Sequence, residues 1–135
     1  MKYNAVVHRK FALLDKYLTQ LQNQLKDVSI EAFKDDWALQ RMTERVLQVM
    51  TEVVIDIAER IVAQKGAGPT ATAAEAIEKL VELRVIESAK PYTDMVWFRN
   101  LIIHRYEEID PTIVFSLAKN RLDGFRQFRD EIDQA

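Results

Sequence analysis

The chain of 135 residues and 15.7 kDa is long enough for one domain with a core of its own. Hydrophobic residues at 48% and charged residues at 30% exclude intrinsic disorder, and three glycines with three prolines supply too few turns for a β-sandwich or barrel. A net charge of −2 excludes a general polyanion binder, so any contact with nucleic acid has to come from a local basic cluster. We therefore expect a single all-α domain over residues 1–135.

The sequence also lacks the features of secreted, membrane and thiol-dependent proteins. It contains no cysteine, which removes disulfides, thiol nucleophiles and thiolate metal ligands. It has no run of about 18 apolar residues that would predict a membrane span, and charges throughout residues 1–18 argue against a secretory signal. We expect a cytoplasmic protein without membrane contact.

Apolar residues recur at steps of three and four along the first half of the chain and predict two helices. The first covers about residues 7–28 and the second about residues 35–65. At 1.5 Å per residue the second helix would be about 45 Å long, which suits a bundle or the spine of a dimer. Gly66 follows it as a left-handed C-terminal cap.

Capping signals predict three further helices, over about residues 73–88, 91–108 and 111–132. Thr72 and Glu75 have the spacing of a capping box, and Pro91 suits the first turn of the next helix. Asp110 followed by Pro111 is typical of the N-cap and first position of the last helix. Because short connections favour antiparallel neighbours, we expect an up-and-down bundle of about five helices.

The helix predicted over residues 91–108 carries the candidate functional residues. At 100° per residue, Arg99 falls in the middle of the apolar arc, where a guanidinium is costly unless it meets an anion or several acceptors. Asn100 and His104 lie four residues apart on one face, and Arg99 and Tyr106 lie seven apart on another. One helix thus offers a cation, an imidazole and a phenol.

Arg99 and His104 suit phosphate chemistry by residue type. A guanidinium stays charged and binds phosphate as a fork, and an imidazole with a reference pKa of about 6.5 suits proton transfer. The two residues differ by about 140° around the helix, so a two-fold dimer is needed to bring both types to one small group. From spacing alone, packing with an ordinary salt bridge is the more common role. Glu107 and Glu108 could then pair with Arg105 or with a lysine elsewhere in the chain.

Trp37 and Trp97 could each have either a structural role or a role in binding a substrate. We expect Trp37 and Trp97 to be core or interface anchors rather than platforms on which bases stack. We expect residues 84–90 to form a solvated face, although they could supply positive charge near a cleft. These interpretations follow the more common role of each residue type.

Residues 99–106, RNLIIHRY, resemble the Arg-x4-His-x-Tyr motif of the HEPN superfamily, in its HepT-like toxin branch. Asn100 supplies the polar residue that this family favours directly after the arginine. The long helix containing ERVLQVMTEVVIDIAERIV, the Gly/Pro loop and the closing helix after EEIDP also fall where that family has them. The resemblance therefore covers essentially the whole chain.

The resemblance implies a homodimeric helical bundle that acts as a metal-independent endoribonuclease and needs no cofactor. It also implies the toxin of a toxin-antitoxin pair, with a small nucleotidyltransferase antitoxin that can transfer AMP to Tyr106. On this hypothesis the catalytic residues are Arg99, His104 and Asn100. His104 handles the proton, Arg99 stabilises the phosphorane, and Asn100 orients His104 or donates to the phosphate.

Two other functions remain open at this stage. The chain could be a non-catalytic nucleotide- or substrate-binding subunit of a partner nucleotidyltransferase, because such bundles resemble the helical domain attached to some of those enzymes. It could also be a plain dimerisation scaffold, in which Arg99 and His104 are surface or salt-bridge residues. RNA cleavage separates the ribonuclease from both.

Overall fold

The computed structural model describes residues 4–104 and 109–135, and within them the chain forms helices and no strands. The helices are α1 (Ala5–Leu25), α2 (Ile30–Lys34), α3 (Trp37–Gln64), α4 (Ala73–Glu82), α5 (Lys90–His104), α6 (Pro111–Asn120) and α7 (Asp123–Gln134). The all-α prediction is confirmed, although the described part holds seven helices where about five were expected. None of these helices is long and apolar enough to cross a membrane.

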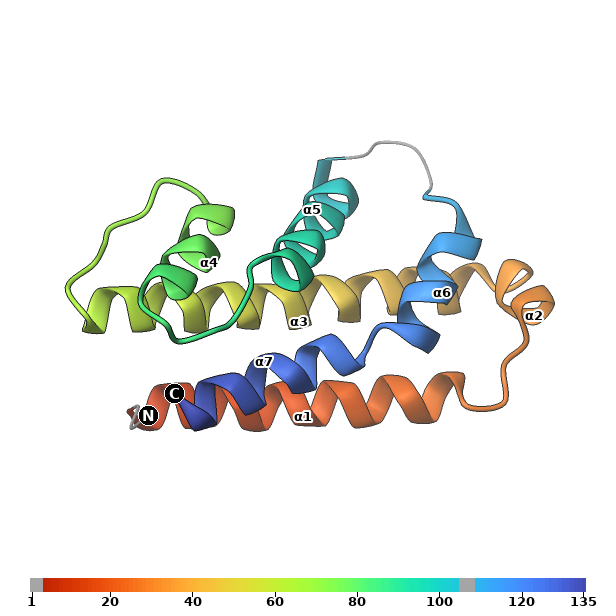
Figure 1. Cartoon of the computed structure of the whole chain (residues 1–135). Helices are drawn as coiled ribbons and strands as arrows, with labels where there is room; N and C mark the ends of the chain where they lie inside the picture. The colour runs from red at the N-terminus through yellow and green to blue at the C-terminus, as the bar shows by residue number, and fades with distance from the viewer. Residues whose placement is uncertain (1–3, 105–108) are drawn as a thin grey trace.

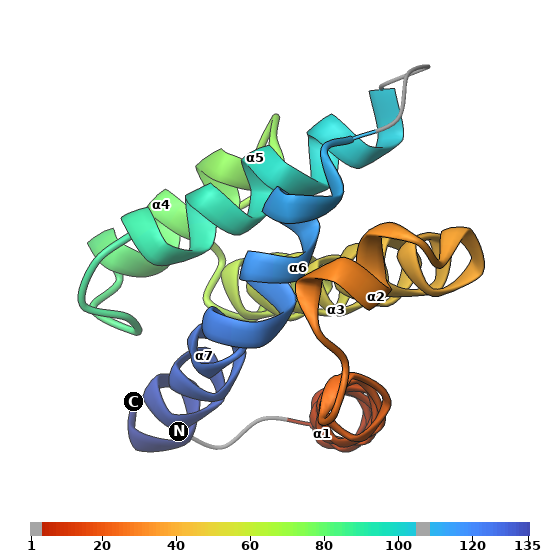
Figure 2. The ribbon, with the colours of Figure 1, turned by 90° about the vertical axis from the view of Figure 1, so that its right-hand side faces the viewer.

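The long helix α3 is the spine of the fold and packs against each of the other six helices. Figure 1 shows α1 and α7 along one side of α3 and α4 and α5 on the other, with the two chain ends close together. α1 and α3 run antiparallel, as expected for a bundle. α5 crosses α3 instead of running alongside it (Figures 1 and 2).

α3 can serve as a spine because its apolar residues cover more than one face. Most of the residues from Val53 to Val62 are buried, so the helix is enclosed rather than laid on a surface. Its end follows the prediction, since Gly66 has a φ of 67° and the N–H of Ala67 donates to the carbonyl of Val62 at 2.9 Å. This left-handed cap stops α3 and starts the loop to α4.

The predicted caps of the later helices are also present. Thr72 Oγ1 accepts from the N–H of Glu75 at 3.0 Å, and Asp110 Oδ1 accepts from the N–H of Thr112 at 2.9 Å. Capping residues act within one turn, so the local sequence is sufficient to place them.

The helices differ from the prediction in three places. α4 ends at Glu82 rather than near 88, since Val85 and Ile86 turn into the core. α2 is five residues long, too short for a periodic pattern, and buries Phe33. The helix predicted over residues 111–132 breaks after Asn120 into α6 and α7, and the break turns α7 so that Phe128 packs against Phe11 of α1 at 6.4 Å between ring centroids.

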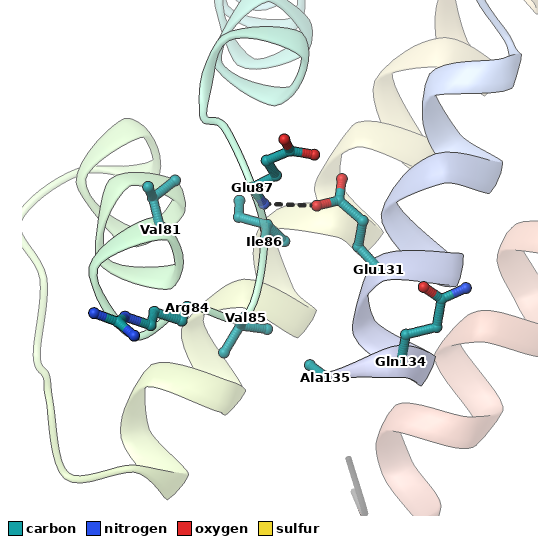
Figure 3. A pocket seen from close by; sticks show the side chains of 8 residues that line it. All are labelled: Val81, Arg84, Val85, Ile86, Glu87, Glu131, Gln134 and Ala135. Carbon is teal, nitrogen blue, oxygen red and sulfur yellow. Dashed lines mark hydrogen bonds between the residues drawn. The ribbon is translucent and has the colours of Figure 1, made fainter.

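A buried hydrogen bond ties the start of α5 to α7. Tyr92 is inaccessible to solvent, and its phenol donates to the carboxylate of Glu131. The other oxygen of that carboxylate accepts from the N–H of Glu87 at 2.7 Å, beside a shallow hollow of about 460 Å³ (Figure 3). Burial, followed by the contact with Glu131, raises the pKa of Tyr92 well above its usual value. These hydrogen bonds fix the position of the start of α5 against α7.

Tyr92→Phe is expected to destabilise the fold by about 1–3 kcal/mol, because it removes a hydrogen bond to a carboxylate. The raised pKa of Tyr92 favours the neutral phenol in the folded chain, so wild-type stability should fall as the pH rises above about 10, where the unfolded tyrosine ionises. Urea unfolding at pH 7 and at alkaline pH tests both effects. If wild type and Tyr92→Phe lose the same amount of stability at alkaline pH, the alkaline loss does not come from ionisation of Tyr92, which would contradict this account.

Candidate active site

Burial falls along α5 from its start to its end. Tyr92, Val96 and Phe98 are buried, whereas no residue from 99 to 104 is fully buried. The first part of the helix is thus held by α3, α4 and α7. The last turn and a half, which carries the predicted catalytic residues, lies at the surface.

Arg99 is half-buried, and one nitrogen of its guanidinium has no hydrogen-bond acceptor among the described residues. Its Nε is shielded from solvent and makes no hydrogen bond within residues 4–104 and 109–135. Arg99 follows the buried Tyr92 by seven residues and Val96 by three, so it extends the inward face of α5. A desolvated N–H donor without an acceptor is unfavourable, and an anion at this point would satisfy it.

Asn100 and His104 lie on a different face of α5. Both are exposed, and they follow Trp97 by three and seven residues, which places all three side chains in one stripe. Trp97 itself is 66% exposed. Arg99 lies about 140° around the helix from His104, so one chain does not aim both at the same phosphate.

The two tryptophans contradict part of the sequence-based expectation. Trp37 and Trp97 are 65% and 66% exposed, so neither is a core anchor. Trp37 lies in the first turn of α3, and Trp97 lies on the outward side of α5. Their role at an interface stays a prediction.

Tyr106 lies outside the described residues. The same holds for Arg105, Glu107 and Glu108, so the suggested pairing of those carboxylates is a prediction that the structure does not address. The described part of the chain brings no three histidine, aspartate or glutamate side chains together in the manner of a metal site.

A groove of about 610 Å³, here called the Trp97 groove, is lined by residues of α3, α5, α6 and α7. Its floor is apolar and includes Leu47, Met95, Phe98, Leu117 and Phe125. Its rim is polar and includes Asp94, Asn120, Arg121, Asp123 and Gln127, with Trp97 and Ile113 at the mouth. Arg99, Asn100 and His104 do not line it.

Gly124 leaves room for the end of the Met95 side chain between α5 and α7. A Cβ at this position would lie 2.6 Å from Cε of Met95, the tip of a flexible side chain, so a side chain there would displace the Met95 methyl group. Sequence periodicity could not find the groove, because the break after Asn120 places Arg121 on the rim instead of on the inner face predicted for one continuous helix.

The chain is similar to known proteins in both sequence and fold. A family model described as "Ribonuclease HepT-like" matches residues 14–132. A tRNA nuclease HepT of Aphanizomenon flos-aquae is 30% identical over 112 residues, which cover 82% of this chain and 76% of that protein. An mRNA nuclease HepT of Shewanella oneidensis is 30% identical over 133 residues, which cover 96% and 97%.

Solved structures match the fold over nearly the whole chain. A crystal structure of a toxin-antitoxin with AMP-PNP has a TM-score of 0.89 and 28% identity, and it covers 98% of this chain and 100% of the other. A tri-AMPylated Shewanella oneidensis HEPN toxin in complex with MNT antitoxin has a TM-score of 0.90 at the same identity and coverage.

Proposed function

The chain belongs to the HepT-like ribonuclease family, and from this we propose that it is the endoribonuclease toxin of a toxin-antitoxin system. The match over residues 14–132 carries the proposal. The motif residues Arg99, Asn100 and His104, at the accessible end of α5, support it. The partner is a nucleotidyltransferase antitoxin, as in the similar complex of a HEPN toxin with MNT antitoxin.

The reaction uses a nucleophile that the RNA itself supplies. The ribose 2′-OH attacks the adjacent phosphorus, a P–O bond forms there, and the bond to the 5′-oxygen of the next nucleotide breaks. The products are a 2′,3′-cyclic phosphate and a free 5′-OH. This route requires proton transfer and charge stabilisation but neither a metal ion nor a protein nucleophile, so we assign a metal-independent cleavage.

Each motif residue has one task in this reaction. His104, exposed to solvent, takes the proton of the 2′-OH or gives one to the leaving oxygen. Arg99 donates its shielded Nε–H and its terminal N–H groups to the non-bridging oxygens as negative charge grows on them. Asn100, on the face of His104, orients the imidazole or donates to the phosphate.

The active enzyme is a homodimer, because the angle between Arg99 and His104 leaves each chain with half of the site. A two-fold axis near the end of α5 brings Arg99 of one copy to His104 of the other. Ile103 is 42% exposed beside His104 and supplies apolar surface for this contact.

His104→Ala is expected to lower RNA cleavage by about 10²–10⁴-fold, because it removes the proton-transfer group. Arg99→Ala should cost about 10²–10³-fold through loss of charge stabilisation. The assay is cleavage of purified RNA in EDTA, with His8→Ala as the matched control for the other histidine. Equal cleavage by wild type and His104→Ala would refute the assignment. A wild type that cleaves no RNA would favour the non-catalytic subunit.

Mixing the two inactive variants tests the shared site. In an equal mixture of Arg99→Ala and His104→Ala chains that exchange freely, half of the dimers are mixed, and each has one of its two sites intact. Activity should therefore recover to about a quarter of the wild-type value. Each variant mixed with itself is the control. No recovery in a mixture shown to contain mixed dimers would mean that one chain holds the complete site.

Co-expression with the nucleotidyltransferase tests neutralisation. AMP on Tyr106 would add negative charge and bulk near Arg99, so it would occupy the phosphate position and repel RNA. Mass spectrometry should find added AMP on Tyr106, and Tyr106→Phe should escape the modification. Fully neutralised wild-type protein with an unmodified Tyr106 would exclude this route.

A further inference from the structure

The Trp97 groove is a prominent surface feature that the proposed cleavage does not use. We propose that it is the subsite for one nucleobase of the RNA strand, with Trp97 as the surface on which that base stacks. The inference rests on the proposed ribonuclease function and adds to it the residues that select the sequence at the cut.

One residue at the mouth of the groove, Trp97, lies on the same face of α5 as the proposed proton-transfer residue, His104. Trp97 precedes His104 by seven residues, which places the two side chains within about 20° of each other around the helix and about 10 Å apart along it. Asn100 lies between them on the same stripe and is exposed. A single strand cut beside His104 therefore passes Trp97 within a short step along its backbone.

The exposure of Trp97 indicates a binding surface. Its side chain is 66% exposed and lies at the mouth of an apolar hollow. Single-stranded nucleic acids are held by bases stacked on such rings. The floor below it, which includes Phe98 and Phe125, is apolar and suits the face of a base.

The rim of the groove offers the polar groups that a base edge needs. The side-chain amide of Asn120 carries donors and an acceptor, which match the mixed pattern of a nucleobase edge. Gln127 also lines the groove, and its side-chain nitrogen donates to Glu131 at 3.3 Å, so its amide oxygen is the group it offers to a base. Asn120 is exposed and makes no side-chain hydrogen bond within the described part of the chain. The volume of about 610 Å³ lies within the range of small-ligand sites.

The charges on the rim favour a nucleic acid strand over an apolar protein segment. Asp94 pairs with Lys90 at 2.9 Å and Asp123 pairs with Arg126 at 3.2 Å. Arg121, by contrast, forms no ion pair with any residue that the structure describes. The cation left on the rim complements the phosphate attached to a stacked base.

The experiment uses an RNA oligonucleotide with one cleavage site and a set of copies that each lack one base near the cut. Wild type should lose about 5- to 100-fold in kcat/KM when one particular base is absent. Trp97→Leu should show the same loss with the intact RNA and no further loss when that base is removed. Trp97→Phe should recover part of the loss. Trp37→Leu, at the other exposed tryptophan, is the matched control and should cleave normally.

Two results would overturn the base subsite. One is a Trp97→Leu enzyme that cleaves like wild type and still responds to the missing base. The other is a Trp97→Leu enzyme that is inactive and sediments as a monomer. That result would assign the Trp97 face to the contact with the second copy.

Fluorescence separates this inference from the proposed catalysis. In a Trp37→Phe background Trp97 is the only tryptophan, and 2′-O-methyl RNA binds without being cut. Quenching of Trp97 by that RNA supports stacking even if the wild type cleaves nothing. Unchanged fluorescence at RNA concentrations that saturate the protein overturns the subsite even if cleavage is confirmed.

Discussion

A half-buried guanidinium with a shielded, unpaired Nε–H is the constraint on which the rest of the site depends. Arg99 occupies a position that the helix pattern directs inward, yet the described part of the chain gives its Nε no acceptor. The fold holds this arrangement because the start of α5 is fixed by Tyr92, Glu131 and the packing on α3. In the proposed reaction, an RNA phosphate supplies the missing acceptor and the charge that a guanidinium prefers.

The fold divides its tasks between a rigid spine and an accessible helix end. α3 contacts every other helix, and α1 and α7 close one side of it (Figure 1). α5 leans across this spine (Figure 2). Burial falls along α5 toward His104. Because Arg99 and His104 point in different directions from one rod, a dimer is the simplest way to complete a site without bending the helix.

Local signals in the sequence were sufficient for much of the fold. The extent of α3, the cap at Gly66 and the N-caps at Thr72 and Asp110 each depend on residues within a few positions, and each was predicted. The break after Asn120 was not, because it follows from packing between α7 and residues far away in the chain. The early end of α4 has the same kind of cause, the burial of Val85 and Ile86.

The candidate site also has one part that the local sequence predicts and one part that depends on tertiary structure. Helical spacing placed Asn100 and His104 together and Arg99 apart from them, since all three belong to one element. The Trp97 groove could not be predicted, because its lining residues come from α3, α5, α6 and α7. Tertiary structure alone shows that Trp97, on the outward stripe of α5, also lines a groove.

The most direct measurement of the central claim follows the Nε–H signal of Arg99 by NMR during titration with 2′-O-methyl RNA. Arg60, whose Nε donates to Asp56 at 3.0 Å, is the internal reference. If Arg99 meets the phosphate, its Nε–H resonance shifts and saturates with the RNA while that of Arg60 stays unchanged. RNA that binds fully without moving the Arg99 signal would contradict the claim.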